Sequence, residues 1–131
     1  MKVLIIIPAR KGSKGLRNKN FLKIGSRSLI EHSCIFSKKL NFAEKTIISS
    51  DSKKAEIVAK KFGILFSKRP RKLARDNSLM IDLVRFEIKK NKGFTHVLIL
   101  QPTCPFRKKE IFFNAYQKLK NKKLDSIFTI R

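Results

Sequence analysis

One basic segment with two glycines, PARKGSKGLRNKN at residues 8–20, combines the residue types that bind phosphate. Gly12 and Gly15 permit unusual backbone dihedral angles and a close approach of a ligand to the main chain, and the N–H groups of such a turn can surround an anion. Positive charge that could spread over phosphate oxygens is supplied by Arg10, Lys14 and Lys19. The spacing matches neither G-x-x-x-x-G-K-[ST] nor G-x-G-x-x-G, which argues against a P-loop enzyme and a dinucleotide-binding site. A phosphate site and a basic surface turn are the two interpretations that remain.

A second segment whose residue types could bind a ligand is QPTCPFR at residues 101–107. Its two prolines restrict the backbone and remove two N–H donors, so the loop could hold the Gln101 amide and the Thr103 hydroxyl at fixed positions. An amide offers both donors and acceptors, which suits a base edge or a sugar hydroxyl. A purely structural turn is the alternative.

Polar residues also follow two other predicted strands. Arg69, beside Pro70, could reach a phosphate or a base. Asp76 and Ser78 precede a helical pattern, so we expect them to cap that helix. Asp51 could bind a sugar hydroxyl or a metal, but its place directly before a helix favours a capping role there too.

Short apolar runs rich in β-branched residues alternate with helical patterns along the chain. This βαβαβαβαβ order predicts a three-layer α/β fold, in which helices cover both faces of a mostly parallel sheet. Ligands of such sheets bind beyond the carboxyl ends of the strands, where the segments above are located. Ser52 and Gly63 should begin and end the second helix. The predicted strands span residues 3–7, 46–49, 64–66, 96–100 and 126–130, and the predicted helices span residues 29–40, 53–62, 79–90 and 108–120.

The chain has 131 residues and a formal net charge of +23, so it fits one domain or slightly less and has a strongly basic surface. Such a charge first suggests nucleic acid as a partner. The lysines are scattered in pairs, however, and no aromatic residues alternate with them on a basic face. A lysine-rich solvated surface is therefore the favoured interpretation, and attraction of a polyanionic small molecule is a second contributor. No apolar run approaches the ~18 residues of a membrane span.

The cysteines and histidines indicate no metal site and no disulfide framework. Cys34 and Cys104 lack the spacing of metal ligands, and His32 and His96 favour core or surface roles. Cys34 is expected to fill the interior of a helix. Cys104 lies nearer the candidate site, but no base accompanies it, so a nucleophilic role is disfavoured. A reduced cytoplasm is the expected location.

Three segments together resemble the acylneuraminate cytidylyltransferases, the CMP-sialic acid synthetase family. They are IIPARKGSKGLRNKN at residues 6–20, RPRKLARD at residues 69–76 and QPTCPFR at residues 101–107. The family pattern is IIPAR-x-GSKG-x-x-x-KN, RP-x-x-LA-x-D and QPTSPLR. The related deoxy-octulosonate cytidylyltransferases have a different first loop, and GSKGL is more similar to the sialic or legionaminic branch than to the pseudaminic branch. The resemblance implies a nucleotide-diphospho-sugar transferase-like, Rossmann-like fold.

The resemblance implies transfer of CMP from CTP to a nine-carbon 2-keto sugar acid. The anomeric hydroxyl would attack the α-phosphorus and release pyrophosphate, a reaction that depends on positioning and charge stabilisation. By the same resemblance, Arg10 and Lys14 would be catalytic and would hold the triphosphate. The nucleotide would be bound by Ala9, Arg10, Gly12, Ser13, Lys19, Asn20, Arg69 and Ser78. The sugar acid and the nucleotide would be bordered by Gln101, Pro102 and Thr103.

The resemblance covers only the N-terminal portion of the family's domain. We therefore expect residues 1–131 to be the N-terminal part of a single, truncated cytidylyltransferase domain. The part of the family domain beyond it would carry the acidic Mg²⁺ ligands and the segment exchanged between the subunits of the family's dimer, so no metal ligand is expected in this chain. Membrane and nucleic-acid partners are not expected. The competing hypotheses are a basic nucleic-acid-binding domain and an inactive remnant that cannot complete its core.

Overall fold

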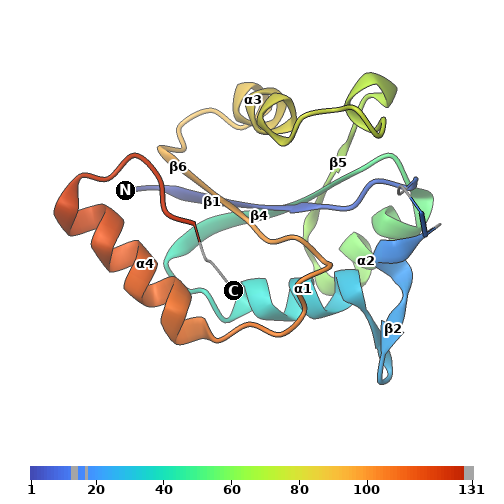
Figure 1. Cartoon of the computed structure of the whole chain (residues 1–131), viewed down its shortest axis with the longest axis horizontal. Helices are drawn as coiled ribbons and strands as arrows, with labels where there is room; N and C mark the ends of the chain where they lie inside the picture. Colours follow the sequence, from blue (N-terminus) through green and yellow to red (C-terminus); the bar gives the residue numbers. More distant parts are fainter. Residues whose placement is uncertain (13–14, 17, 129–131) are drawn as a thin grey trace.

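A four-stranded parallel sheet is the centre of the computed structural model, which describes residues 1–12, 15–16 and 18–128. The strands of this sheet span Val3–Pro8 (β1), Ala43–Ser50 (β4), Leu65–Lys68 (β5) and His96–Ile99 (β6). They lie in the order β5-β4-β1-β6 (Figure 1). Every residue of β1 is buried, as its continuous run of apolar residues predicts. In the register of the sheet, Ile6 lies between Ile47 of β4 and Ile99 of β6.

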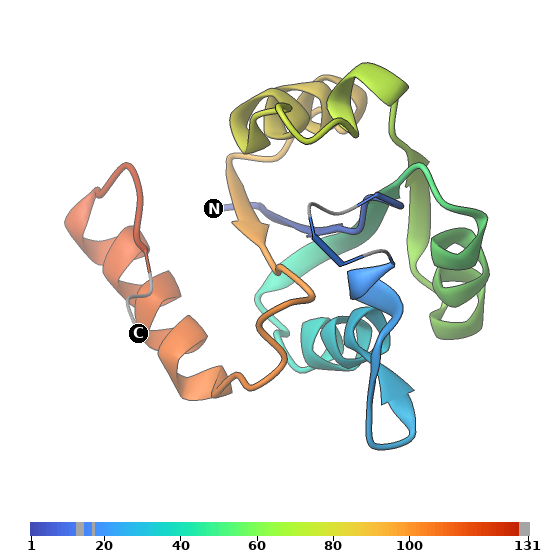
Figure 2. The same ribbon diagram turned by 45° about the vertical axis from the view of Figure 1, so that its right-hand side comes forward.

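Helices cover both faces of this sheet, which confirms the predicted three-layer arrangement (Figures 1 and 2). They span Leu29–Lys38 (α1), Lys53–Phe62 (α2), Met80–Lys90 (α3) and Lys109–Lys122 (α4). One face packs Ile5 and Ile7 against α1, α2 and α4, and the other packs Leu4 and Ile6 against α3. Successive residues of β1 therefore supply the two cores in alternation. No helix in the described ranges is both long and apolar enough to cross a membrane.

Local capping chemistry sets the ends of α1 and α2. Ser28 Oγ accepts a hydrogen bond from the N–H of Glu31 at 3.3 Å, and the Glu31 carboxylate accepts one from the N–H of Ser28 at 3.2 Å. This reciprocal pair is a capping box at the start of α1. Ser52 caps α2 through the N–H of Lys54, and Gly63 ends it in the left-handed region at φ 63°. Both predictions for the ends of α2 are confirmed.

Two predicted caps of α3 are wrong. The helix begins after Leu79, which provides no side-chain cap, so neither Asp76 nor Ser78 has that role. The Asp76 carboxylate forms an ion pair with Arg10. The Ser78 hydroxyl donates to the carbonyl of Lys72 at 2.8 Å. Both side chains therefore hold the segment between β5 and α3. Asp76 binds a residue distant in sequence and Ser78 binds within its own turn, so neither binds the N–H groups at the start of α3.

The sequence patterns do not predict several short elements. A hairpin follows the first loop, with strands Lys23–Ile24 (β2) and Arg27–Ser28 (β3). His32 of α1 lies against it, because a ring nitrogen (Nε2) is 2.9 Å from the carbonyl oxygen of Ile24. Two 3-10 helices are also present, at Lys19–Phe21 (η1) and Arg71–Leu73 (η2). These elements have two or three residues each, too few to show a hydrophobic period.

The predicted strand at residues 126–130 is wrong for residues 126–128, which form no strand, and residues 129–131 lie outside the described part of the chain. Its apolar residues suggest a strand, but a strand forms only by pairing with a neighbour. In the described ranges, nothing pairs with the outer side of β6. Phe128 is accordingly 83% exposed.

Cys34 is a core residue, as predicted. Its side chain is fully buried in the larger core cluster. Burial raises the pKa of the Cys34 thiol to about 12, and the nearby Glu31 carboxylate adds to the increase. A thiol that stays protonated at neutral pH is a poor nucleophile.

Candidate functional site

The loops that follow β1, β4 and β5 meet at one edge of the sheet, because all strands run parallel and end there. The N–H of Ala9 donates to the carbonyl of Ser49 at 3.0 Å, and the N–H of Arg69 donates to the carbonyl of Ser50 at 2.8 Å. The Ser50 hydroxyl donates to the carbonyl of Ala9. These bonds extend the pairing of the strands into the loops. The starts of the three loops are therefore held together at the carboxyl edge of the sheet, where a ligand site was predicted.

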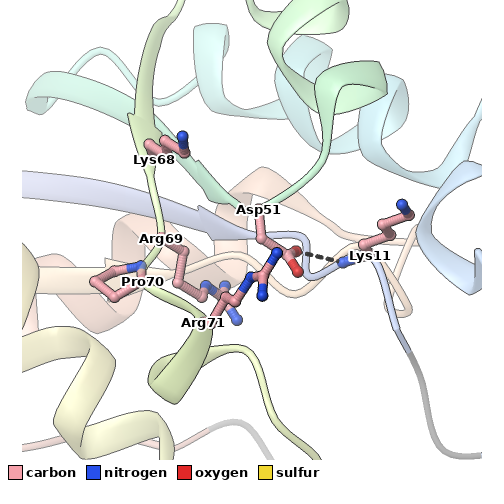
Figure 3. Close-up of a pocket in the computed structure, with 6 residues that line it drawn as sticks. All are labelled: Lys11, Asp51, Lys68, Arg69, Pro70 and Arg71. Carbon is pink, nitrogen blue, oxygen red and sulfur yellow. Dashed lines mark hydrogen bonds between the residues drawn. The ribbon is translucent and has the colours of Figure 1, made fainter.

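A cavity of about 620 Å³ lies at this edge. It is lined by Lys11, Asp51, Lys68, Arg69, Pro70 and Arg71. Figure 3 shows the side chains of Arg69 and Arg71 directed toward Asp51, whereas Lys68 points away from them. Four of the lining residues are cations and one is a carboxylate, so the cavity favours a ligand with several negative charges.

Arg69 is the predicted site residue that lines this cavity. It is only 5% exposed, and its Nη2 donates to the carbonyl of Ser49 at 3.0 Å. Its Nε has no hydrogen-bond partner in the described part of the chain. Burial is the main cause that lowers the pKa of Arg69 to about 10; the Asp51 and Glu87 carboxylates oppose it, and the Arg10 cation adds to it. A buried cation with an open donor is costly without an acceptor, and an anionic ligand would supply one.

Asp51 fixes the first loop to the end of β4. Its Oδ1 accepts a hydrogen bond from the N–H of Lys11 at 2.6 Å (Figure 3). Ser52 caps α2, so the predicted capping role of Asp51 is wrong. The donor that the carboxylate uses instead comes from a segment 40 residues earlier in the chain. Asp51 thereby lines the cavity and anchors one of its walls.

Arg10 lies near the cavity and is held there by an acidic partner. Its Nη1 is 2.6 Å from Oδ1 of Asp76 in an ion pair. Its carbonyl oxygen accepts a hydrogen bond from Nδ2 of Asn20 at 3.2 Å, so buried Asn20 supports the loop from within. Lys19 is exposed in η1. Arg10 is close enough to Arg69 to lower its pKa.

The other predicted site residues that follow β1 and β5 do not line the cavity or lie outside the described residues. Ser13 and Lys14 lie outside the described residues. Gly12 is exposed, and a Cβ built there meets no atom within 4 Å. Gly15, at φ +92°, has a backbone conformation that side-chain-bearing residues rarely adopt. Ser78 does not line the cavity, because its hydroxyl is bonded within its own loop.

The segment after β6 begins at the same edge but does not line the cavity. The N–H of Leu100 donates to the carbonyl of Ile6 at 3.0 Å, which places the start of the segment beside β1. Pro102 is buried, whereas Gln101 and Thr103 are exposed. Arg107 donates to the carbonyl of Gln101 and closes the loop on itself. The structure therefore does not bring Gln101, Pro102 and Thr103 together with Arg69 in one cavity.

Several site residues were missed by reasoning from the sequence. They are Lys11, Lys68, Pro70 and Arg71 as lining residues, and Asp76 as the partner of Arg10. Lys11, Pro70 and Arg71 lie within three residues of the end of a strand and Lys68 is the last residue of β5, so position at a strand end was the signal that could have found the lining residues. The described residues group no three His, Cys, Asp or Glu side chains that could hold a metal ion.

The chain is similar to cytidylyltransferases over nearly its whole length. A family model described as cytidylyltransferase matches residues 4–130. N-acylneuraminate cytidylyltransferase of Escherichia coli is 35% identical over 81% of the chain and 25% of the relative. CMP-N,N'-diacetyllegionaminic acid synthase of Legionella pneumophila is 36% identical over 89% of the chain and 53% of the relative. The chain thus spans from a quarter to about half of the length of these relatives.

Solved structures have the same fold. CMP:2-keto-3-deoxy-manno-octonic acid synthetase, solved in complex with CTP, matches 94% of the chain and 49% of its own with a TM-score of 0.77 at 20% identity. A cytidylyltransferase from Leptospira borgpetersenii matches 93% of the chain and 50% of its own with a TM-score of 0.74 at 23% identity. These similarities confirm the predicted nucleotide-diphospho-sugar transferase-like fold.

Proposed function

Because the chain belongs to the cytidylyltransferase family, we propose that it binds CTP at the carboxyl edge of its sheet and serves the transfer of CMP to a nine-carbon 2-keto sugar acid. Pyrophosphate is the second product. The names of the curated relatives, which include an N-acylneuraminate cytidylyltransferase and a CMP-legionaminic acid synthase, support the choice of a sialic or legionaminic type of acid.

The observation that carries the proposal is the buried Arg69 guanidinium in a cationic cavity. Its Nε–H has no acceptor in the described ranges, and Lys11, Lys68 and Arg71 add positive charge around it. A nucleoside triphosphate brings several negative charges and many acceptor oxygens. A charge-assisted hydrogen bond from a guanidinium to such an oxygen is among the stronger polar contacts in proteins. The cavity therefore suits the triphosphate of CTP.

In the proposed mechanism the protein mainly positions the triphosphate and stabilises charge. Arg10 and Lys14 would hold the phosphates, and loop N–H groups other than those of Ala9 and Lys11, which already have acceptors, would add donors. Negative charge develops on the departing pyrophosphate as the sugar hydroxyl attacks, so fixed cations lower the barrier. Ala9, Gly12, Ser13 and Lys19 complete the proposed phosphate loop, and Asn20 supports it through the Arg10 carbonyl. Ser78 acts indirectly, by holding the loop that presents Asp76.

The proposed position of the sugar acid is beyond β6, next to the nucleotide. Gln101 and Thr103 are exposed there, and their side chains carry the donors and acceptors that sugar hydroxyls use. Pro102 is buried and restricts the backbone between them. The loop is closed by Arg107 on the Gln101 carbonyl, so the Gln101 amide is presented by a restrained turn.

In the proposal, magnesium would arrive bound to the triphosphate and not at a site formed by the described residues. The two carboxylates of the site already have partners, since Asp51 accepts from the N–H of Lys11 and Asp76 pairs with Arg10. Across the described ranges, no third acidic, histidine or cysteine side chain joins them in a group. These residues do not form a magnesium centre, and no step of the reaction is assigned to the metal.

A cytoplasmic location is a further part of the proposal. Cys34 and Cys104 are both free thiols, with Cys34 in the core and Cys104 half-buried. The cytoplasm keeps such thiols reduced, which is consistent with two cysteines that form no disulfide.

Replacing Asp76 with asparagine should tighten CTP binding by up to about fivefold, since an exposed ion pair contributes about 0–1 kcal/mol. Asp76 competes with phosphate for Arg10, and its side chain is 61% exposed. Asp82→Asn is the matched control, because it removes the same charge from an exposed ion pair with Arg85. Calorimetric titration with CTP measures both. Weaker binding by Asp76→Asn would show that the carboxylate positions Arg10 instead of competing for it.

Turnover tests the proposed reaction itself. The purified chain is mixed with CTP, Mg²⁺ and one acid at a time: N-acetylneuraminic acid, N,N'-diacetyllegionaminic acid or 2-keto-3-deoxy-manno-octonic acid. The proposal expects CTP-dependent pyrophosphate release with one of the nine-carbon acids and less with the eight-carbon acid. Release with the eight-carbon acid alone would overturn the assigned substrate class. No release with any acid would overturn a self-sufficient catalytic role for the chain.

A further inference from the structure

The side chain of Glu87 in α3 is fully buried, which is unusual for a carboxylate. Its two oxygens are held by two strands: Ser49 Oγ of β4 donates to Oε1 at 2.7 Å, and Ser67 Oγ of β5 donates to Oε2 at 2.9 Å. In the described ranges it forms no direct ion pair. None of the sequence patterns singles out this residue.

The hydrogen bonds around Glu87 fit an ionised carboxylate. Lys90 Nζ donates to Ser67 Oγ at 2.7 Å, which leaves the Ser67 hydroxyl hydrogen for Glu87. Both carboxylate oxygens therefore act as acceptors, as an ionised group requires. A buried charge without a cation in contact is costly, and two positive charges each bond to one of the serines that hold the carboxylate.

One of those positive charges is Arg69. Ser49 links the two groups, because its hydroxyl donates to Glu87 and its carbonyl oxygen accepts from Arg69 Nη2 at 3.0 Å. Ser67 lies in β5, two residues before Arg69, and both residues are buried. The field of the Glu87 carboxylate reaches Arg69 and opposes the effect of burial on its pKa. Arg69, which lines the cavity, therefore has a buried carboxylate one residue away, on the other side of Ser49.

We propose that Glu87 is a positioning residue of the nucleotide site, which holds the Arg69 guanidinium in its buried orientation through Ser49, while Ser67 holds the second oxygen of the carboxylate. This inference rests on the proposed binding of CTP. Arg69 is buried at the carboxyl ends of β4 and β5. Without the Glu87 carboxylate, the guanidinium would lose an attraction that offsets its removal from water. The side chain would then turn toward solvent and would no longer be held at the wall of the cavity.

A positioning role and a simple charge effect predict opposite changes in the CTP affinity of Glu87→Gln, which makes the proposal testable. Glu87→Gln removes one negative charge close to a site for a polyanion, so attraction alone would tighten CTP binding. A positioning role predicts that binding becomes about 5- to 10-fold weaker, as for the loss of a hydrogen bond to a charged group. Glutamine keeps the volume of the side chain and can still bond to both serines.

The experiment is a calorimetric titration of the 131-residue chain with CTP, with Asp82→Asn as the control. Asp82 lies on the same helix and loses the same charge, but it is paired with Arg85 at the surface. The unfolding midpoint in urea is measured for each variant. We expect weaker binding for Glu87→Gln and unchanged or slightly tighter binding for Asp82→Asn. Equal or tighter binding by folded Glu87→Gln would overturn the positioning role.

The dependence of CTP binding on pH tests whether the charge of Glu87 acts on Arg69. Arg69 is faced by Asp51 and Glu87, which favour its charged form, and by Arg10, which disfavours it. CTP affinity of the unchanged chain should fall as the pH rises through about 10, the pKa of Arg69. In Glu87→Gln this fall should begin at lower pH, because one carboxylate that favours the cation is gone. An unmoved profile would show that the charge of Glu87 does not act on Arg69, which would contradict the proposed coupling.

Two further variants keep the test decisive. Ser67→Ala removes one hydroxyl and leaves the carboxylate, so it should weaken CTP binding by about threefold. This variant tests the proposal if Glu87→Gln fails to fold.

In an Arg69→Lys background, Glu87→Gln should weaken CTP binding by less than twofold, because the two residues act together. Additive losses would overturn the coupling. No CTP binding by the unchanged chain would overturn the proposed function as well, whereas CTP binding with unaffected variants would overturn only this inference.

Discussion

Replacing Arg69 with methionine should weaken CTP binding by about 100-fold, which corresponds to about 2.7 kcal/mol. The substitution keeps an extended side chain but removes the guanidinium, whose buried Nε–H has no acceptor in the described residues and which lines the cavity. The loss of charged hydrogen bonds in a site removed from water is costly in this range. Calorimetric titration with CTP at moderate salt measures the change.

Arg85→Met is the matched control for this substitution. Arg85 lies on the surface of α3, with its side chain 70% exposed, and pairs only weakly with Asp82 at 3.5 Å. Its replacement removes the same charge from the protein and should change CTP binding less than twofold, because exposed charges are screened by salt. If Arg69→Met and Arg85→Met bind CTP equally well, the cavity is not the nucleotide site.

Replacing Ile5 with alanine should destabilise the protein by about 2–5 kcal/mol, the usual cost of shortening a fully buried aliphatic side chain. Ile5 lies in the central strand, is completely buried and belongs to the larger core cluster. The total stability of a domain is about 5–15 kcal/mol, so this single change should remove a large part of it. The urea midpoint of unfolding, followed by circular dichroism, measures the effect.

Ile57→Ala tests whether that cost comes from burial. Ile57 lies in α2 but is 66% exposed, so the same change of side chain removes little apolar surface from the interior. We expect a shift of under about 0.5 kcal/mol, as for most surface substitutions. Similar losses for Ile5→Ala and Ile57→Ala would mean that β1 does not lie at the centre of a packed core.

Features that depend on local sequence were predicted well. The apolar run at β1 indicated a strand buried on both faces, and all six of its residues are buried. Ser52 and Gly63 indicated the ends of α2, because a cap depends on residues within one turn of the helix. The segments beyond β1, β4 and β5 were expected to meet, because the carboxyl ends of parallel strands share one edge.

Features that depend on distant partners were not predicted. Asp76 and Asp51 both have the residue type and position of a helix cap, but they bind Arg10 and the N–H of Lys11, which are 66 and 40 residues away in sequence. Nothing in the local sequence distinguishes the two roles. The buried position of Glu87 is hidden for the same reason, since an acidic residue in a helix with many charged neighbours is usually exposed.

The central claim is that the cavity beside Arg69 is a site for CTP. Calorimetric titration of the purified chain with CTP and Mg²⁺ at moderate salt, with ATP as the control, tests it most directly. We predict saturable binding of CTP with clearly weaker binding of ATP, because a cytidylyltransferase must distinguish the base as well as the phosphates. Equal affinity for the two nucleotides, with a steep decline as salt is added, would instead show that the +23 surface attracts any polyanion and would contradict the claim.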